Sequence, residues 1–121
     1  MVGVTAADAG MLPSYDFLLE DESVIPVGRL KLHTILTPGH TPGSMCFKIE
    51  GSPVLFSGDT LFPGGPGATT WDYSSFASII RSIDDRLFTL PPETLVLPGH
   101  GADTTVGTER PHLQEWADRG W

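Results

Sequence analysis

The stretch TPGHTPGS at residues 37–44 decides the fold, and His40 stands at its centre between two Pro-Gly pairs. Two later stretches share its design, an apolar run followed by a polar residue in a glycine-containing turn. They are FSGDTLF at residues 56–62, which carries Asp59, and PGHG at residues 98–101, which carries His100. The shared design predicts that all three polar side chains point off the same edge of one sheet.

Two imidazoles and a carboxylate indicate a metal site. Zinc and related ions prefer imidazole nitrogen and carboxylate oxygen, and a pair of ions can share a bridging carboxylate. A bound ion lowers the pKa of its water toward ~7, so we expect no catalytic side chain beyond the metal ligands. Taken singly, His40, Asp59 and His100 are each ordinary turn or surface residues. The prediction therefore depends on all three occurring together.

The remaining pattern predicts a single α/β domain over residues 1–121. The spacing of apolar residues places its regular elements. In chain order we expect a hairpin over residues 23–36, a second hairpin over 44–57, a helix over 74–88 capped by Asp72 or Ser74, a strand over 94–97 and a helix over 109–116. Residues 1–23 and the Gly- and Pro-rich residues 63–70 lack any period and are expected to be irregular.

Composition limits the partners. A net charge of -8 argues against nucleic acid and against an anionic membrane surface as partners, since both need clustered Lys and Arg. No stretch approaches the ~20 apolar residues of a membrane span.

The single cysteine, Cys46, lies in an apolar run and is expected to be a buried thiol in a cytoplasmic protein. His33 and His112 are expected to be surface or packing residues rather than ligands.

Four segments together resemble the metallo-β-lactamase superfamily, in its glyoxalase II-like (hydroxyacylglutathione hydrolase-like) branch. They are residues 37–44, 57–62, 90–101 and 104–113. The resemblance implies the C-terminal βα half of an αββα sandwich. It also implies that His40 binds a first ion, Asp59 bridges two ions and His100 binds the second. Zinc is the metal implied, with iron or manganese as alternatives, and Thr60 is expected to support the ligands by a hydrogen bond.

Two features depart from the family pattern. The motif His-x-His-x-Asp-His, which supplies the other ligands, does not occur in these 121 residues, and Ala68 stands where the family commonly has arginine. Three interpretations stay open. The first is a metal-dependent hydrolase with a small-molecule substrate, an ester, thioester or lactone, in which this chain carries half of the metal site and is inactive alone. The second is a truncated, non-catalytic half-domain that self-associates, and the third is an iron-dependent persulfide dioxygenase.

The strands also predict self-association. Successive strand residues point to opposite faces, and one helix over residues 74–88 covers only one face. The apolar strand residues exceed what that helix can cover, and they include Leu30, Leu32, Leu36, Met45, Phe47, Val54 and Phe56. A large apolar face rarely stays open to water, so we expect a homodimer in which two sheets pack together.

Overall fold

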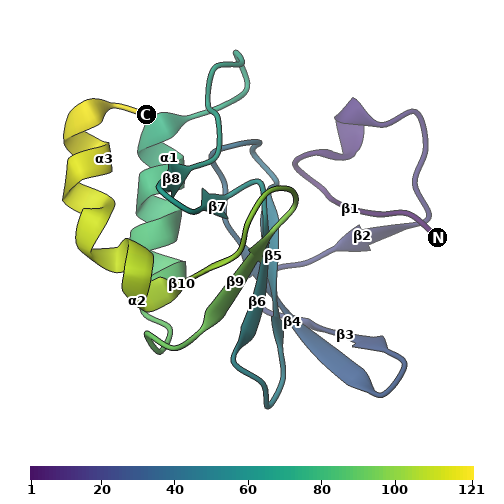
Figure 1. The fold of residues 1–121 in the computed structure, drawn as a ribbon. Helices are drawn as coiled ribbons and strands as arrows, with labels where there is room; N and C mark the ends of the chain where they lie inside the picture. Colours follow the sequence, from purple (N-terminus) through teal and green to yellow (C-terminus); the bar gives the residue numbers. More distant parts are fainter.

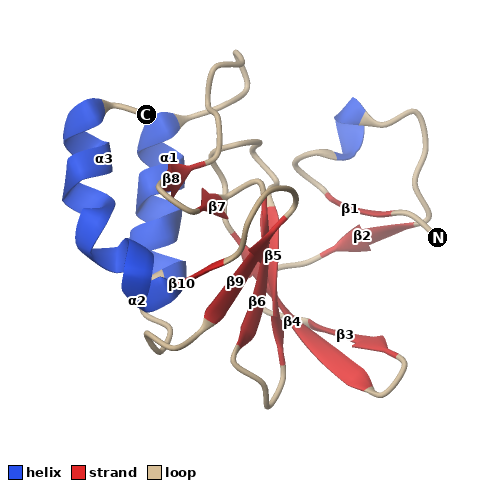
Figure 2. Ribbon diagram, in the orientation of Figure 1, coloured by secondary structure: helices blue, strands red, loops and turns tan.

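The computed structural model describes residues 1–121, and its centre is a six-stranded mixed sheet (Figures 1 and 2). In spatial order the strands are β10 (Thr104–Thr105), β9 (Leu95–Pro98), β6 (Val54–Gly58), β5 (Met45–Ile49), β4 (Leu30–Leu36) and β3 (Val24–Val27). Neighbours are antiparallel except β6 and β9, which are parallel. Parallel neighbours need a long crossover, and here the crossover contains the first helix.

The helices lie on one face of this sheet (Figure 1). They are α1 (Phe76–Ser82), which continues into the π-helical turn η2 (Ile83–Leu87), then α2 (Val106–Glu109), the 3-10 turn η3 (Arg110–His112) and α3 (Leu113–Arg119). Between helices and sheet lies a core of fully buried side chains that includes Leu55, Ile79, Ile83, Leu87, Val96 and Trp116. None of the helices is long and apolar enough to cross a bilayer.

The predicted hairpins are confirmed as β3–β4 and β5–β6, and the predicted late strand is β9. The predicted cap of the first helix is wrong by one residue, because the Oγ of Ser75 accepts the hydrogen bond from the Ser78 N–H. Ser74 is engaged elsewhere, since its hydroxyl donates to the carbonyl of His40 at 2.7 Å. In place of the single helix predicted over residues 109–116, α2, η3 and α3 follow one another from Val106 to Arg119.

The two segments predicted to be irregular contain short strands. Within residues 1–23, β1 (Gly3–Thr5) pairs in parallel with β2 (Phe17–Leu19), and the 3-10 turn η1 (Ala9–Met11) lies between them. Within residues 63–70, β8 (Gly65–Pro66) pairs with β7 (Leu61–Phe62). Strands of two or three residues are too short to show a hydrophobic period. The partner of β1 lies 14 residues along the chain, whereas β7 and β8 form a tight hairpin.

Neither α1 nor α3 lies on the other face of the main sheet (Figure 2). Cys46 and Leu55 point into the core, so their neighbours Phe47 and Phe56, which pair across β5 and β6, point to this second face. Phe56 is 39% exposed. The alternation predicted from the sequence is therefore present.

Candidate metal centre

His40, Asp59 and His100 meet at one edge of the main sheet, as predicted. They follow β4, β6 and β9, which all run in the same direction. The Nε2 atom of His40 lies 3.4 Å from Oδ2 of Asp59, and the Nε2 atom of His100 lies 3.4 Å from Oδ1. Each oxygen of one carboxylate therefore faces a different imidazole.

The spacing suits two ligands of a shared ion better than a hydrogen bond. A charged N–H···O bond is about 2.7–2.9 Å long. By contrast, two ligands each about 2.1 Å from a tetrahedral ion lie about 3.4 Å apart, because the angle between them is about 109°. Both contacts to Asp59 measure 3.4 Å. The donor set and its spacing thus fit one ion at each carboxylate oxygen.

A backbone carbonyl fixes the tautomer of His40. Its Nδ1 atom lies 2.6 Å from the carbonyl oxygen of Ala68, and a carbonyl can only accept, so Nδ1 carries the proton. In a neutral ring Nε2 is then left with a lone pair aimed toward Asp59. The ring of Trp71 packs edge-on at 5.4 Å and restrains the imidazole further.

The loop that carries His40 is tied to elements on both sides. The Ser75 N–H, at the start of α1, donates to the carbonyl of Gly39 at 2.8 Å. On the opposite side Asp8 accepts from the Gly43 N–H at 2.8 Å and from the hydroxyl of Thr41. Asp8 lies 33 and 35 residues before these partners, so no local sequence signal could identify it.

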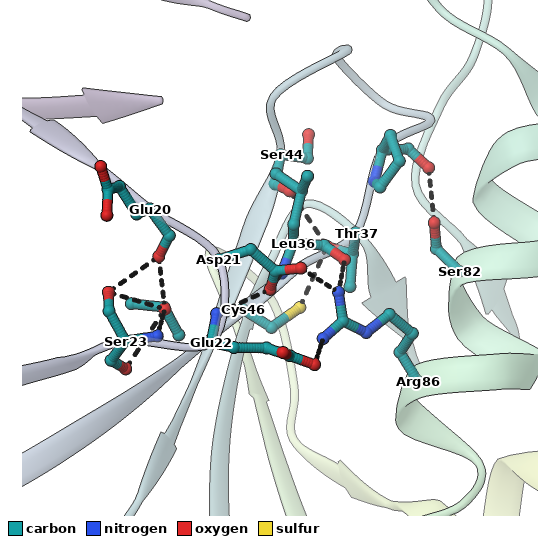
Figure 3. Close-up of polar contacts among 12 residues, drawn as sticks. Glu20, Asp21, Glu22, Ser23, Leu36, Thr37, Ser44, Cys46, Ser82 and Arg86 are labelled. Atoms are coloured by element: carbon teal, nitrogen blue, oxygen red, sulfur yellow. Dashed lines mark hydrogen bonds and ion pairs between the residues drawn. The ribbon is translucent and has the colours of Figure 1, made fainter. Parts of the chain in front are cut away.

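A second cluster fixes the base of the same loop (Figure 3). Arg86, on η2, donates to Asp21 at 2.6 Å and to the carbonyl of Leu36 at 3.1 Å. Burial alone would raise the pKa of Asp21, but the hydrogen bonds from Arg86 and from the Leu36 N–H outweigh it and lower the pKa. Because Leu36 ends β4, this cluster holds the point where the strand becomes the His40 loop.

Asp59 sits in a turn that depends on Gly67. A Cβ added to Gly67 would lie 1.7 Å from the carbonyl oxygen of Asp59, so only glycine allows the two backbones to approach this closely. Thr60 is buried, and its hydroxyl lies 3.0 Å from that of Thr37. Thr60 therefore joins the bases of two loops, and its hydroxyl pairs with Thr37 rather than with a member of the metal centre.

The other histidines and the cysteine lie outside the centre. His33 pairs with Glu50 at 3.2 Å and His112 with Glu115 at 3.1 Å, both on the surface, as predicted. Cys46 is fully buried, and burial raises the pKa of its thiol to about 11. The predicted buried thiol is therefore correct.

The centre has few ligands for a complete site. No three His, Cys, Asp or Glu side chains surround a single point. Each oxygen of Asp59 is matched by one imidazole, His40 or His100, which gives two side-chain ligands per ion. Zinc sites use three or four protein ligands, so the residues present fit half of a dinuclear centre.

Two curated relatives carry related names. "Probable metallo-hydrolase YqgX" of Bacillus subtilis is 41% identical over 95 residues, which cover 78% of this chain and 45% of the relative. "Hydroxyacylglutathione hydrolase GloC" of Haemophilus influenzae is 32% identical over 105 residues, which cover 82% of this chain and 50% of the relative. The chain thus spans about half the length of these relatives.

Solved structures and the family assignment agree. The crystal structure of the BLEG-1 B3 metallo-beta-lactamase has a TM-score of 0.83 and 29% identity, covering 91% of this chain and 62% of that one. The structure of TTHA1623 in a di-iron-bound form has a TM-score of 0.78 and 28% identity, covering 89% and 61%. Residues 5–100 match the family described as the metallo-beta-lactamase superfamily. The chain therefore belongs to the metallo-beta-lactamase superfamily.

Proposed function

We propose that this chain contributes half of a dinuclear metal centre to a hydrolase that cleaves a small ester, thioester or lactone. The observation that carries the proposal is the pair of 3.4 Å contacts that His40 and His100 make to opposite oxygens of Asp59. Bound ions would supply an activated water and a positive charge for the developing oxyanion. The chain supplies the ligands and holds them rigidly.

Each residue of the centre has a definite part. His40 and His100 would each hold an ion through Nε2, and Asp59, which faces both imidazoles, would be the ligand common to the two ions. The Ala68 carbonyl keeps the proton of His40 on Nδ1, so Nε2 stays available as a ligand. Nitrogen and oxygen donors favour zinc, with manganese or iron as alternatives.

The comparisons support the metal and the reaction class. Members of this superfamily bind metal ions, and one structural neighbour is di-iron-bound. The Haemophilus relative is named as a hydrolase of hydroxyacylglutathione, which is a thioester, and this name favours a thioester among the three substrate classes. An iron-dependent dioxygenase on the same fold is the competing reaction, and the metal that restores activity separates the two.

We expect the 121-residue chain alone to turn over slowly or not at all, because two side-chain ligands per ion leave each ion mobile. The test is an assay of the full chain with added zinc, manganese or iron against model thioesters, esters and lactones. Asp59→Ala is the variant and His33→Ala the control. Rapid turnover that Asp59→Ala abolishes would contradict the half-site. If the chain shows no metal-dependent binding or turnover even when a second chain supplies the missing His-x-His-x-Asp-His ligands, the proposed hydrolase function is contradicted.

We propose as a second candidate that the chain self-associates through its apolar sheet face. Phe47 and Phe56 pair on this face, and no helix of the chain covers them. Light scattering behind size exclusion should give twice the 13.0 kDa chain mass. Phe56→Lys should give a monomer, and Arg81→Glu, at an exposed residue of α1 on the opposite, helix-covered face of the sheet (Figure 1), should leave the dimer intact. A wild-type monomer that binds no hydrophobic dye would contradict this candidate.

A further inference from the structure

A cavity of about 470 Å³ opens directly from the metal centre. His40, Asp59 and His100 line it together with three aromatic residues, Phe62, Trp71 and Trp121, and the Gly- and Pro-rich residues 63–67. Phe62 packs on His100 with ring centroids 4.7 Å apart, while Trp71 contacts His40. The lining also includes the last turn of α3 and the chain end, which Figure 1 shows beside β8. This arrangement provides room for an apolar body next to the reacting group.

Arg119 is the one arginine or lysine in the lining, and it is held in place. Its guanidinium lies 3.9 Å over the ring of Trp121, and its Nε donates to the Trp121 carbonyl at 2.7 Å. Its Nη2 lies 3.5 Å from the carbonyl of Gly64. A Cβ added to Gly65 would lie 2.9 Å from the same Nη2, so the glycine makes space for the guanidinium.

The wall under Arg119 is itself fixed. Glu109 is buried and accepts from the Gly64 N–H at 2.9 Å and from the hydroxyl of Thr104 at 2.6 Å. Both polar groups of the Gly64 peptide therefore have partners, the N–H in Glu109 and the carbonyl in Arg119. A fixed wall reduces the ordering cost of a ligand that binds there.

Arg119 has hydrogen-bonding capacity to spare. A guanidinium offers five N–H donors, and the two bonds to Trp121 and Gly64 leave three. None of the ion pairs in the chain includes Arg119, although the net charge is -8. A guanidinium that has spare N–H donors and no acidic side-chain partner, in a cavity of an acidic protein, can bind an anionic ligand.

We propose that Arg119 binds a carboxylate of the substrate, so that the preferred substrate is an acyl compound with an apolar body and a carboxylate distant from the bond that is cleaved. The inference rests on the proposed function, because that function makes this cavity the substrate site. Arg119 would hold the carboxylate, and the walls formed by Phe62 and Trp71 would contact the apolar body. A monoanion fits better than a phosphate dianion, since Asp59 lines the same cavity.

The test is binding to the metal-free full chain, followed by NMR at the indole N–H groups of Trp71 and Trp121. The probes are 4-phenylbutanoate and 4-phenylbutanamide, which differ in charge but hardly in size. We expect the acid to bind about tenfold more tightly, the increment of one charge-assisted contact. Arg119→Gln should reduce affinity for the acid about tenfold and leave that for the amide unchanged. Arg81→Gln, on α1 and outside the cavity, is the control and should change neither.

Equal affinities of acid and amide for the wild-type chain would overturn the proposal. So would an acid preference that survives Arg119→Gln, which would place the carboxylate on the imidazoles. Should Arg119→Gln fail to fold, the Arg119 Nε–H signal of the wild type decides: the acid should shift it and the amide should not, and equal shifts overturn the proposal. The test uses neither metal ions nor turnover, so its result can be interpreted even if the proposed metal centre is wrong.

Discussion

Substituting Gly67 with alanine should damage both stability and the metal centre. The added Cβ would lie 1.7 Å from the Asp59 carbonyl oxygen, where real contacts are at least 3.0 Å, so the backbone must move by about 1.3 Å. Backbone cannot yield as a side-chain tip can, and forcing an extra carbon into a packed region costs about 1–3 kcal/mol. The Gly67 N–H also donates to the Thr60 carbonyl at 3.0 Å, so the shift strains the Asp59 turn from two directions.

The assay is urea denaturation followed by tryptophan fluorescence, together with zinc titration of the folded protein. Gly67→Ala should lose about 1–3 kcal/mol of unfolding free energy and bind zinc at least tenfold more weakly. The matched control is Gly10→Ala, where an added Cβ meets nothing within 4 Å, and it should change stability by about 0.5 kcal/mol or less. If Gly67→Ala matches the wild type in both measurements, the close packing around Asp59 is not what positions the carboxylate.

Two further expectations concern ionisable groups away from the metal centre. Arg86→Gln should destabilise the fold by about 1 kcal/mol at neutral pH. Because the pKa of Asp21 is lowered in the folded state, the stability difference between wild type and variant should be full above the ordinary pKa of 3.8 and should shrink as the pH falls below it. A stability difference that stays constant down to pH 2 would contradict the pairing of Arg86 with Asp21. Cys46, whose pKa is raised to about 11 by burial, should resist a thiol reagent at pH 8 until urea unfolds the chain. Fast labelling of the native protein would show that Cys46 is reachable.

Local patterns predicted the parts of the fold that local physics controls. The hairpins follow from alternating apolar residues, and α1 follows from the helical spacing around Ile79 and Ile83. The convergence of His40 and Asp59 was predictable because each follows a strand of the same direction and stands in a glycine turn. Parallel pairing of β6 with β9 then brings His100 to the same edge.

Long-range contacts explain what the sequence did not predict. Asp8 acts on a loop more than 30 residues away, and the strands β1 and β2 are too short for a period. Ser75 rather than Ser74 caps α1, because Ser74 is drawn to the His40 carbonyl by the folded loop. Arg119 lies far along the chain from the motifs, and only the packing of α3 beside β8 brings it into the cavity.

The most direct test of the metal centre is calorimetric titration of zinc into the metal-free chain, wild type against Asp59→Ala. We expect the wild type to bind zinc, with shifts of the His40 and His100 ring signals when the same titration is followed by NMR. Asp59→Ala should lose at least about tenfold in affinity. His33→Ala, which removes a surface imidazole paired with Glu50, should bind as the wild type does. Zinc affinity that survives Asp59→Ala, or that falls with His33→Ala instead, would show that the metal ligands lie elsewhere.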